Sequence, residues 1–222
     1  MEITLPSEVP VMTLPNLVFF PQAFLPLHIF EPRYREMLRD VLASNRLFAV
    51  ACLDSRPVGK FEPLHRVATI GMVRTCQKAE NGTSNLLLQG LVRIECQSIL
   101  DEQPYRRIRV RALSSHPAPD LAQAAKLRTG LAQLIAIKQR LGGEVSRELI
   151  QFLKTIDDPE AFLDLAAFNL CHDSQVKQSL LETLDVPTRF DLFSRQLRND
   201  IAELKLRQKL QGKLSDGDIG VN

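Results

Sequence analysis

The sequence has no long hydrophobic run, no tryptophan and almost no net charge. No apolar segment approaches the roughly 18 residues of a membrane-spanning helix, so we expect no membrane span. The 28 basic and 26 acidic residues give a formal charge of +2, too small to indicate nucleic acid or an anionic membrane as a partner. The apolar N-terminal stretch is broken by prolines and preceded by acidic Glu2 and Glu8, unlike a signal peptide. We therefore expect a cytoplasmic protein.

Cysteines and histidines form no metal-binding motif. The cysteines are scattered, without a CxxC pair or a histidine at ligand spacing. Three of them, Cys52, Cys76 and Cys96, lie in strand-like runs, where a buried thiol is the expected state. Cys171 and His172 are adjacent, but neighbouring residues point in different directions on a helix and no third group orients them. The sequence thus predicts no metal ion, no cofactor and no catalytic dyad.

Catalytic motifs are equally scarce. A phosphate-binding GxxxxGK[ST] loop is missing, as are HExxH, GxSxG and GxGxxG motifs. Ser146 and Ser194 have no activating neighbour and fit helix caps or helix surfaces. The adjacent carboxylates Asp157 and Asp158 fit a helix cap better than an acid–base pair. We therefore expect neither ATP hydrolysis nor proteolysis.

The most informative segment that is present runs from Leu14 to Leu42. Pro21 and Pro26 each remove a backbone donor, so the apolar runs 17–20 and 24–30 cannot lie in a central strand without a bulge or an edge position. From Pro32 the apolar spacing changes to that of an amphipathic helix. The apolar stripe of this helix consists of Tyr34, Met37, Leu38, Val41 and Leu42.

Up to about residue 115 the rest of the chain reads mainly as strands. The expected strands are 47–54, 67–77, 85–99 and 105–113. The segment Ser55–His65, with two prolines and a glycine, is an expected loop. The pair Asn81-Gly82 predicts a hairpin, and Gly71 and Gly90 are candidate positions for bulges or barrel corners. In the last strand, apolar residues alternate with arginines, so one face is expected in a core and the other in water.

Beyond a proline-rich boundary at 116–120 the pattern is helical. Helices are expected over 120–141, 146–156, 157–170, 173–184 and from Thr188 to about Lys213. The almost wholly apolar segment 162–170 is expected at the centre of the helical half. In the last helix, Leu206 and Leu210 drift off the apolar stripe. We expect the part past Leu204 to project, either frayed or used in self-association as a weak homodimer.

Two quoted segments carry a family resemblance. LPNLVFFPQAFLPLHIFEPRY resembles the start, and SLLETLDVPTRFDLFSRQLRNDIAELKL is similar to the end, of the N-terminal, substrate-recognition domain of Lon proteases. The resemblance covers roughly Leu14 to Leu210. It implies an α+β fold with a PUA-like bent sheet or pseudo-barrel and one helix over 1–116, an α-helical bundle ending in a long helix over 117–214, and a flexible tail over 215–222. We expect a module without the ATPase and peptidase domains.

What this resemblance implies for function is binding of unfolded or partly folded polypeptides, or of a protein partner such as a separate protease or chaperone. The candidate binding residues belong to the N-terminal motif: Phe19, Phe20, Phe24, Leu27, His28, Phe30, Glu31, Arg33 and Tyr34. For each apolar residue the alternative of a place in the core stays open, because such runs more often fill a core. Glu31 and Arg33 can equally form a helix cap and a surface ion pair.

RNA binding is the second hypothesis. The β-rich half of Lon N-terminal domains is similar to PUA-like folds, some of which bind RNA. The strand 105–111 carries the arginine-lined face that phosphate contact requires, and Arg74, Lys78 and Arg93 could extend it. Against this, only Tyr105 offers a stacking platform nearby, and a solvated strand face explains the same arginines. Nucleic acid is therefore the less favoured partner.

Overall fold

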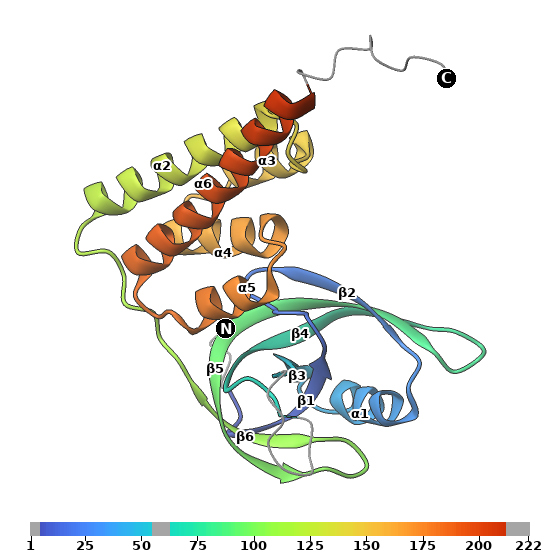
Figure 1. Ribbon diagram of the computed structural model, residues 1–222. Helices are drawn as coiled ribbons and strands as arrows, with labels where there is room; N and C mark the ends of the chain where they lie inside the picture. The colour runs from blue at the N-terminus through green and yellow to red at the C-terminus, as the bar shows by residue number, and fades with distance from the viewer. Residues whose placement is uncertain (1–4, 55–62, 212–222) are drawn as a thin grey trace, which may run out of the picture. The chain divides into compact units, whose positions relative to one another are not determined.

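The computed structural model describes residues 5–54 and 63–211, which form two compact units. The first unit combines Met1–His116 with Asp164–Leu184, and the second combines Pro117–Leu163 with Asp185–Asn222. The strands are β1 (Glu8–Leu14), β2 (Phe24–Ile29), β3 (Leu47–Cys52), β4 (Val67–Lys78), β5 (Ser84–Asp101) and β6 (Arg107–Ala112) (Figure 1). The helices are α1 (Pro32–Leu42), α2 (Leu121–Arg140), α3 (Arg147–Lys154), α4 (Pro159–Leu170), α5 (Ser174–Glu182) and α6 (Val186–Gln211).

The strands of the first unit form a bent sheet that closes on itself. The strand order is β2-β5-β4-β3-β1-β6, and β6 also pairs with β5, so that five strands make a closed ring (Figure 1). Among the strand pairs of the described residues, only β1–β3 is parallel. Apolar residues from all strands of the ring fill its interior: Val9, Val11, Leu47, Ala49, Ala51, Ala68, Ile70, Ile94, Ile108 and Val110. This α+β architecture, with its pseudo-barrel, confirms the predicted fold class.

The long strand β5 is shared between two neighbours on one side. Its first part pairs with β2 and its second part with β6, while β4 follows it along the other side. The register between β4 and β5 shifts at Gly71, which lies opposite Gly90, so the predicted bulge is present. A Cβ on Gly90 would lie 2.1 Å from the Phe20 carbonyl oxygen. Glycine here lets the segment before β2 pass directly over the strand.

Residues 164–184 correct the predicted domain organisation. The sequence predicts one helical subdomain over 117–214 with 162–170 at its centre, whereas the second half of α4 and all of α5 belong to the first unit. Two hydrogen bonds join this segment to β5. Arg93 Nη2 donates to Asp164 Oδ1 at 2.6 Å, and Arg93 Nε donates to the Leu181 carbonyl at 3.2 Å. Arg93 is only 3% exposed, so it cannot extend a basic surface.

The second unit contains α2, α3, α6 and the first half of α4. Asp120 and Ser146 cap α2 and α3, because their side-chain oxygens accept hydrogen bonds from the first-turn amides of Gln123 and Leu149. Along α6 the predicted apolar stripe is buried at Phe190, Phe193, Leu197 and Ile201 and half-buried at Leu204. A buried Lys138 joins α2 to α6 through Asp200, with a 2.6 Å separation between Nζ and Oδ2.

The end of α6 agrees only partly with the expectation of a projecting helix. Leu206 and Leu210 are both 57% exposed, as their positions off the stripe predict. Gln208, however, donates from Nε2 to the Leu141 carbonyl at 3.1 Å, which ties this turn to the end of α2. Self-association through this helix stays a prediction. The predicted tail 215–222 and most of the predicted loop Ser55–His65 lie outside the described residues.

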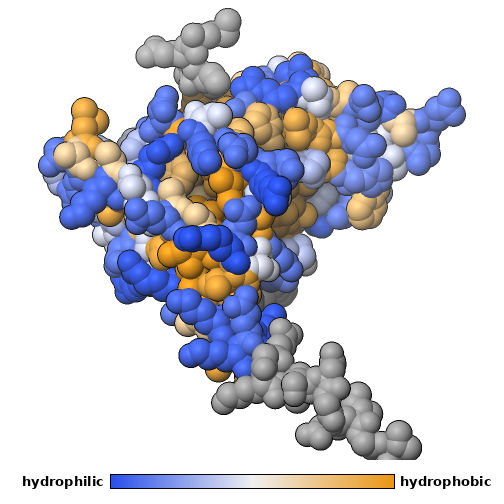
Figure 2. Space-filling model, turned by 90° about the horizontal axis from the view of Figure 1, so that it is seen from above, coloured by the Kyte–Doolittle hydropathy of each residue, from blue (hydrophilic) through white to orange (hydrophobic). Residues whose placement is uncertain are grey.

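The distribution of hydrophilic and hydrophobic residues on the surface does not by itself identify a binding site. Hydrophilic residues make up most of the face drawn in Figure 2, and hydrophobic residues lie between them in patches. Within the described ranges, no helix combines the length and the hydrophobicity needed to cross a bilayer. The same ranges hold no group of three or more histidine, cysteine or acidic residues that could bind a metal ion.

Candidate functional site

The nine motif residues predicted as binding residues separate into a buried and an exposed group. Phe19, Phe20 and Tyr34 are at most 5% exposed. The Phe19 ring meets the edge of Phe168 at 6.3 Å between centroids, and its carbonyl accepts a 2.6 Å hydrogen bond from the Thr69 hydroxyl. These three residues therefore pack the core, the alternative that the sequence left open.

Tyr34 also has a polar role inside the first unit. Its hydroxyl donates to the Thr13 carbonyl at 3.1 Å, and the Thr13 amide lies 3.2 Å from the same hydroxyl oxygen. The contact fixes α1 against the end of β1. The Arg33 guanidinium lies over the Tyr34 ring, with its central carbon 4.5 Å from the ring centroid.

The exposed group belongs to β2 and the residue that follows it. Along β2 the side chains alternate, with Leu25 and Ile29 in the core and the residues between them partly or fully exposed. Phe24 is 48% exposed and Phe30 is 61% exposed, which is unusual for such large apolar side chains. His28 stacks on Phe30 with 6.0 Å between ring centroids. The predicted edge position of this proline-containing run is confirmed, because β2 ends the strand order.

Across the strands, the register extends this exposed surface. Phe24 lies opposite Gln89, and Gln89 lies opposite Met72 on β4. Pro26 lies opposite Leu87. Paired residues of neighbouring strands share a face of the sheet. We call this surface the β2 face and define it by Phe24, Pro26, His28, Phe30, Met72 and Leu87.

Polar contacts border the β2 face, and one of them reaches onto it, because Arg74 Nη1 donates to Met72 Sδ at 3.3 Å. His28 Nδ1 lies 2.7 Å from Asn85 Oδ1, and Arg74 Nε donates to Gln89 Oε1 at 2.6 Å. At the start of α1, Arg33 Nε donates to Glu31 Oε2 at 2.9 Å, in a half-exposed ion pair. This is the surface pair that the sequence allows, worth under about 1 kcal/mol. Leu27, the last predicted residue, is half-buried and lies opposite Leu86.

The arginine-bearing strand presents a different surface. Arg107 bonds Asp101, Arg109 bonds Glu8 and Arg111 bonds Glu95, with N–O separations of 3.2, 2.9 and 2.7 Å. The Arg111 guanidinium accordingly holds the pKa of the Glu95 carboxyl below its ordinary value. Phosphate contact would have to compete with these carboxylates. The RNA hypothesis gains no support from this face.

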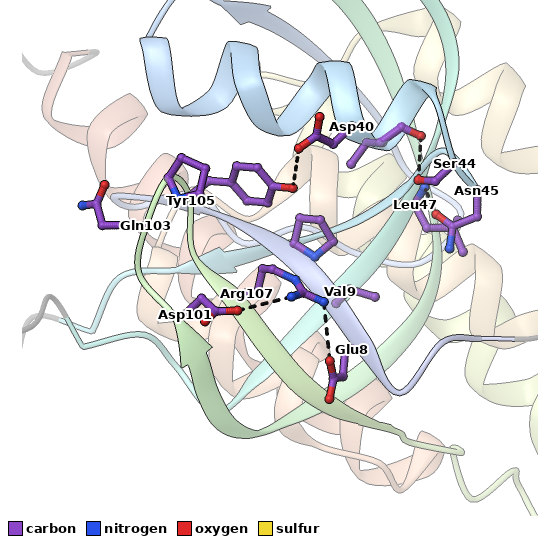
Figure 3. A pocket seen from close by; sticks show the side chains of 13 residues that line it. Glu8, Val9, Asp40, Ser44, Asn45, Leu47, Asp101, Gln103, Tyr105 and Arg107 are labelled. Atoms are coloured by element: carbon purple, nitrogen blue, oxygen red, sulfur yellow. Dashed lines mark hydrogen bonds and ion pairs between the residues drawn. The ribbon is translucent and has the colours of Figure 1, made fainter.

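A hollow of about 570 Å³ lies between β1, the end of α1 and the turn before β6 (Figure 3). At its wall the Tyr105 hydroxyl donates to Asp40 Oδ2 at 2.9 Å. Arg107 reaches both Asp101 and Glu8 on the other side (Figure 3). The hydrogen bonds from Tyr105 and Arg39 lower the pKa of Asp40, and burial raises the pKa of Tyr105. Asp40, Asp101, Glu8 and Arg107 at the hollow thus each have a hydrogen-bonding partner.

Met72, Pro26 and Leu87 are the residues of the β2 face that the sequence prediction missed. The signal available was the alternation in FLPLHI, which reads as one buried and one exposed face. For Met72 and Leu87 no sequence signal existed, because they reach this face only through the pairing of β2 with β5 and of β5 with β4.

Sequence comparisons point to one family. A family model for the ATP-dependent protease La (LON) substrate-binding domain matches residues 8–199. The Lon protease of Desulfosudis oleivorans is 27% identical over 215 residues, which cover 96% of this chain and 26% of that protein. For the Lon protease of Dictyoglomus thermophilum the identity is 24% over 217 residues, with 96% and 27% covered. The chain thus spans about a quarter of the length of these curated relatives.

Solved structures share the fold at low sequence identity. The N-terminal domain of the Mycobacterium avium complex Lon protease matches with a TM-score of 0.67 and 19% identity, over 88% of this chain and 98% of that one. A Lon N-terminal domain protein from Xanthomonas campestris matches with a TM-score of 0.59 and 18% identity, over 85% and 97%.

Proposed function

Because the chain belongs to the family of LON substrate-binding domains, we propose that it binds unfolded or partly folded polypeptides through the β2 face. The observation that carries the proposal is the exposure of Phe24 and Phe30 on one side of an edge strand. Burying a phenylalanine side chain contributes about 1.5–3 kcal/mol, so two such anchors contribute at most about 6 kcal/mol, which corresponds to weak binding, with a Kd of tens of micromolar or more. A protease or chaperone that receives the bound polypeptide fits the same proposal as a further partner.

The chemistry of the β2 face suits apolar segments with little regard to sequence. Its anchors are aromatic or aliphatic, while its neighbours Asn85 and Gln89 are uncharged and can form hydrogen bonds with many partners. The ion pair of Glu31 and Arg33 adds no net charge at the border, and Arg74, which bonds Gln89 and Met72, adds one positive charge. Binding should therefore depend weakly on salt, in contrast to RNA binding, which weakens steeply through counterion release.

The test measures binding of fluorescently labelled β-casein by anisotropy at 50 and 300 mM salt. We expect Phe24→Ser combined with Phe30→Ser to weaken binding at least tenfold at both salt concentrations. The control is Leu121→Ser in α2, which removes an apolar side chain of 88% exposure that belongs to the second unit. Equal affinity of the double variant and the control would contradict the proposal, and salt-sensitive binding of an RNA oligonucleotide alone would favour the second hypothesis.

A further inference from the structure

The backbone of β2 has one free side. In the part of the chain that the structure describes, β2 pairs with β5 and with no second strand. The Gly90 amide donates to the Ala23 carbonyl at 2.9 Å, so the carbonyl group of Ala23 faces β5. In an antiparallel ladder these inward-facing positions alternate, and the register from Phe24 to Ile29 contains no shift. The backbone groups of Phe24, Pro26 and His28 therefore point away from β5.

The same three residues carry exposed side chains of the β2 face. Phe24 is 48% exposed, and Pro26 and His28 are also exposed. A free row of backbone groups and a row of exposed side chains thus run along one strand. An extended polypeptide matches both at once, since its backbone repeats the donors and acceptors and every second side chain falls on the same face.

We propose that an extended polypeptide segment adds to the free edge of β2 as a further β-strand, with its apolar side chains on the β2 face. The proposal rests on the function proposed above and specifies how the segment is held. The edge offers three carbonyl acceptors and two amide donors, because Pro26 has no N–H. Main-chain bonds are common to all sequences, and the β2 face then selects segments in which apolar residues alternate.

Pro26 limits what this edge can bind. A proline in an edge strand removes one donor and so hinders the pairing of two folded copies through their edges. A partner strand bound here loses one hydrogen bond as well. Replacing Pro26 with valine restores the donor and keeps a side chain that favours strands. The variant should bind an extended peptide about two- to tenfold more tightly, as one additional net hydrogen bond predicts.

The main test uses a synthetic peptide in which phenylalanine alternates with threonine between terminal lysines. Its phenylalanines fix which face it presents, so only every second amide can point at β2. Two matched peptides carry the same number of N-methyl groups, either on the phenylalanine amides or on the threonine amides. Antiparallel addition points the phenylalanine amides at β2, and parallel addition points the threonine amides there.

We expect one methylated peptide to lose at least tenfold in affinity while the other binds like the parent. Equal losses for both would overturn strand addition and leave the proposed function standing. Failure of the parent peptide and of β-casein to bind would instead contradict the proposed function. For Pro26→Val the control is Pro119→Val in the linker, and a gain in dimer formation without a gain in peptide affinity would also overturn strand addition.

Discussion

At the scale of single residues, the first unit contains a buried ion pair between Arg93 and Asp164. Both side chains are at most 3% exposed, and their separation of 2.6 Å is that of a charge-assisted hydrogen bond. Removing one member leaves the other charge buried without its partner. This penalty is far larger than the contribution of an exposed pair such as Arg111 and Glu95.

We expect Arg93→Leu to lower the free energy of unfolding by about 3–5 kcal/mol, because the Asp164 carboxylate then stays buried without its guanidinium. Urea unfolding followed by circular dichroism provides the measurement. The control, Arg111→Leu, removes an arginine whose side chain is 63% exposed and should cost under about 1 kcal/mol. Similar losses for both variants would show that the buried pair contributes no more to stability than an exposed pair.

The hydrogen bond from Tyr105 to Asp40 predicts a pH effect. Since the folded state holds the pKa of Asp40 below its unfolded value, the stabilisation is present above the unfolded pKa and is lost as pH falls through the folded pKa. We expect Tyr105→Phe to raise the pKa of Asp40 toward its ordinary value, as measured by carboxyl NMR titration. Tyr34→Phe is the control, because that hydroxyl bonds Thr13. An unchanged Asp40 pKa in Tyr105→Phe would refute the assignment.

At the scale of elements, two glycines test opposite effects of an added methyl group. A Cβ on Gly90 would lie 2.1 Å from the Phe20 carbonyl oxygen, whereas one on Gly130 in α2 meets nothing within 4 Å. We expect Gly90→Ala to destabilise by about 1–3 kcal/mol through backbone displacement. Gly130→Ala should stabilise by about 0.5–1 kcal/mol, as alanine does within a helix. Thermal unfolding of both variants gives the comparison, and a neutral Gly90→Ala would contradict the close passage described above.

Local patterns in the sequence were sufficient for most elements. The helical spacing after Pro32, the cap at Asp158 and the bulge at Gly71 each depend on neighbours in the chain, and each is confirmed. The place of α5 could not be predicted in this way. It depends on Arg93 meeting groups 71 and 88 residues away in the sequence, and an arginine in an alternating strand gives no local sign of burial.

The candidate site was predictable to a similar degree. The motif identified the correct segment, but sequence alone could not separate the buried Phe19 and Phe20 from the exposed Phe24 and Phe30. The difference arises where Phe20 and Pro21 pass over Gly90 just before β2 begins, because the chain enters the edge strand only after that crossing. The phenylalanines before and after that crossing look alike in the sequence but have different surroundings in the fold.

At the scale of the whole molecule, the two units interleave along the chain. The first unit includes Asp164–Leu184, so a fragment 1–116 lacks both Asp164 and Leu181, which accept hydrogen bonds from Arg93. We expect that fragment to show no cooperative unfolding and poorly dispersed amide NMR signals. The fragment 1–184 retains both parts of the first unit and should show dispersed signals from its strands. A well-folded 1–116 fragment would show that α5 is dispensable for the sheet.

The buried pair of Arg93 and Asp164 can form only after both residues have been synthesised. Asp164 leaves the ribosome 71 residues after Arg93, which corresponds to about 4–14 seconds at about 5–20 residues per second. During that interval the nascent sheet has β5 and β2 but not the carboxylate that neutralises its interior arginine. An incomplete sheet with a free edge is prone to join a neighbouring chain on the same polysome. Pro26 lacks an N–H and therefore makes such pairing through β2 less favourable while the rest of the unit is synthesised.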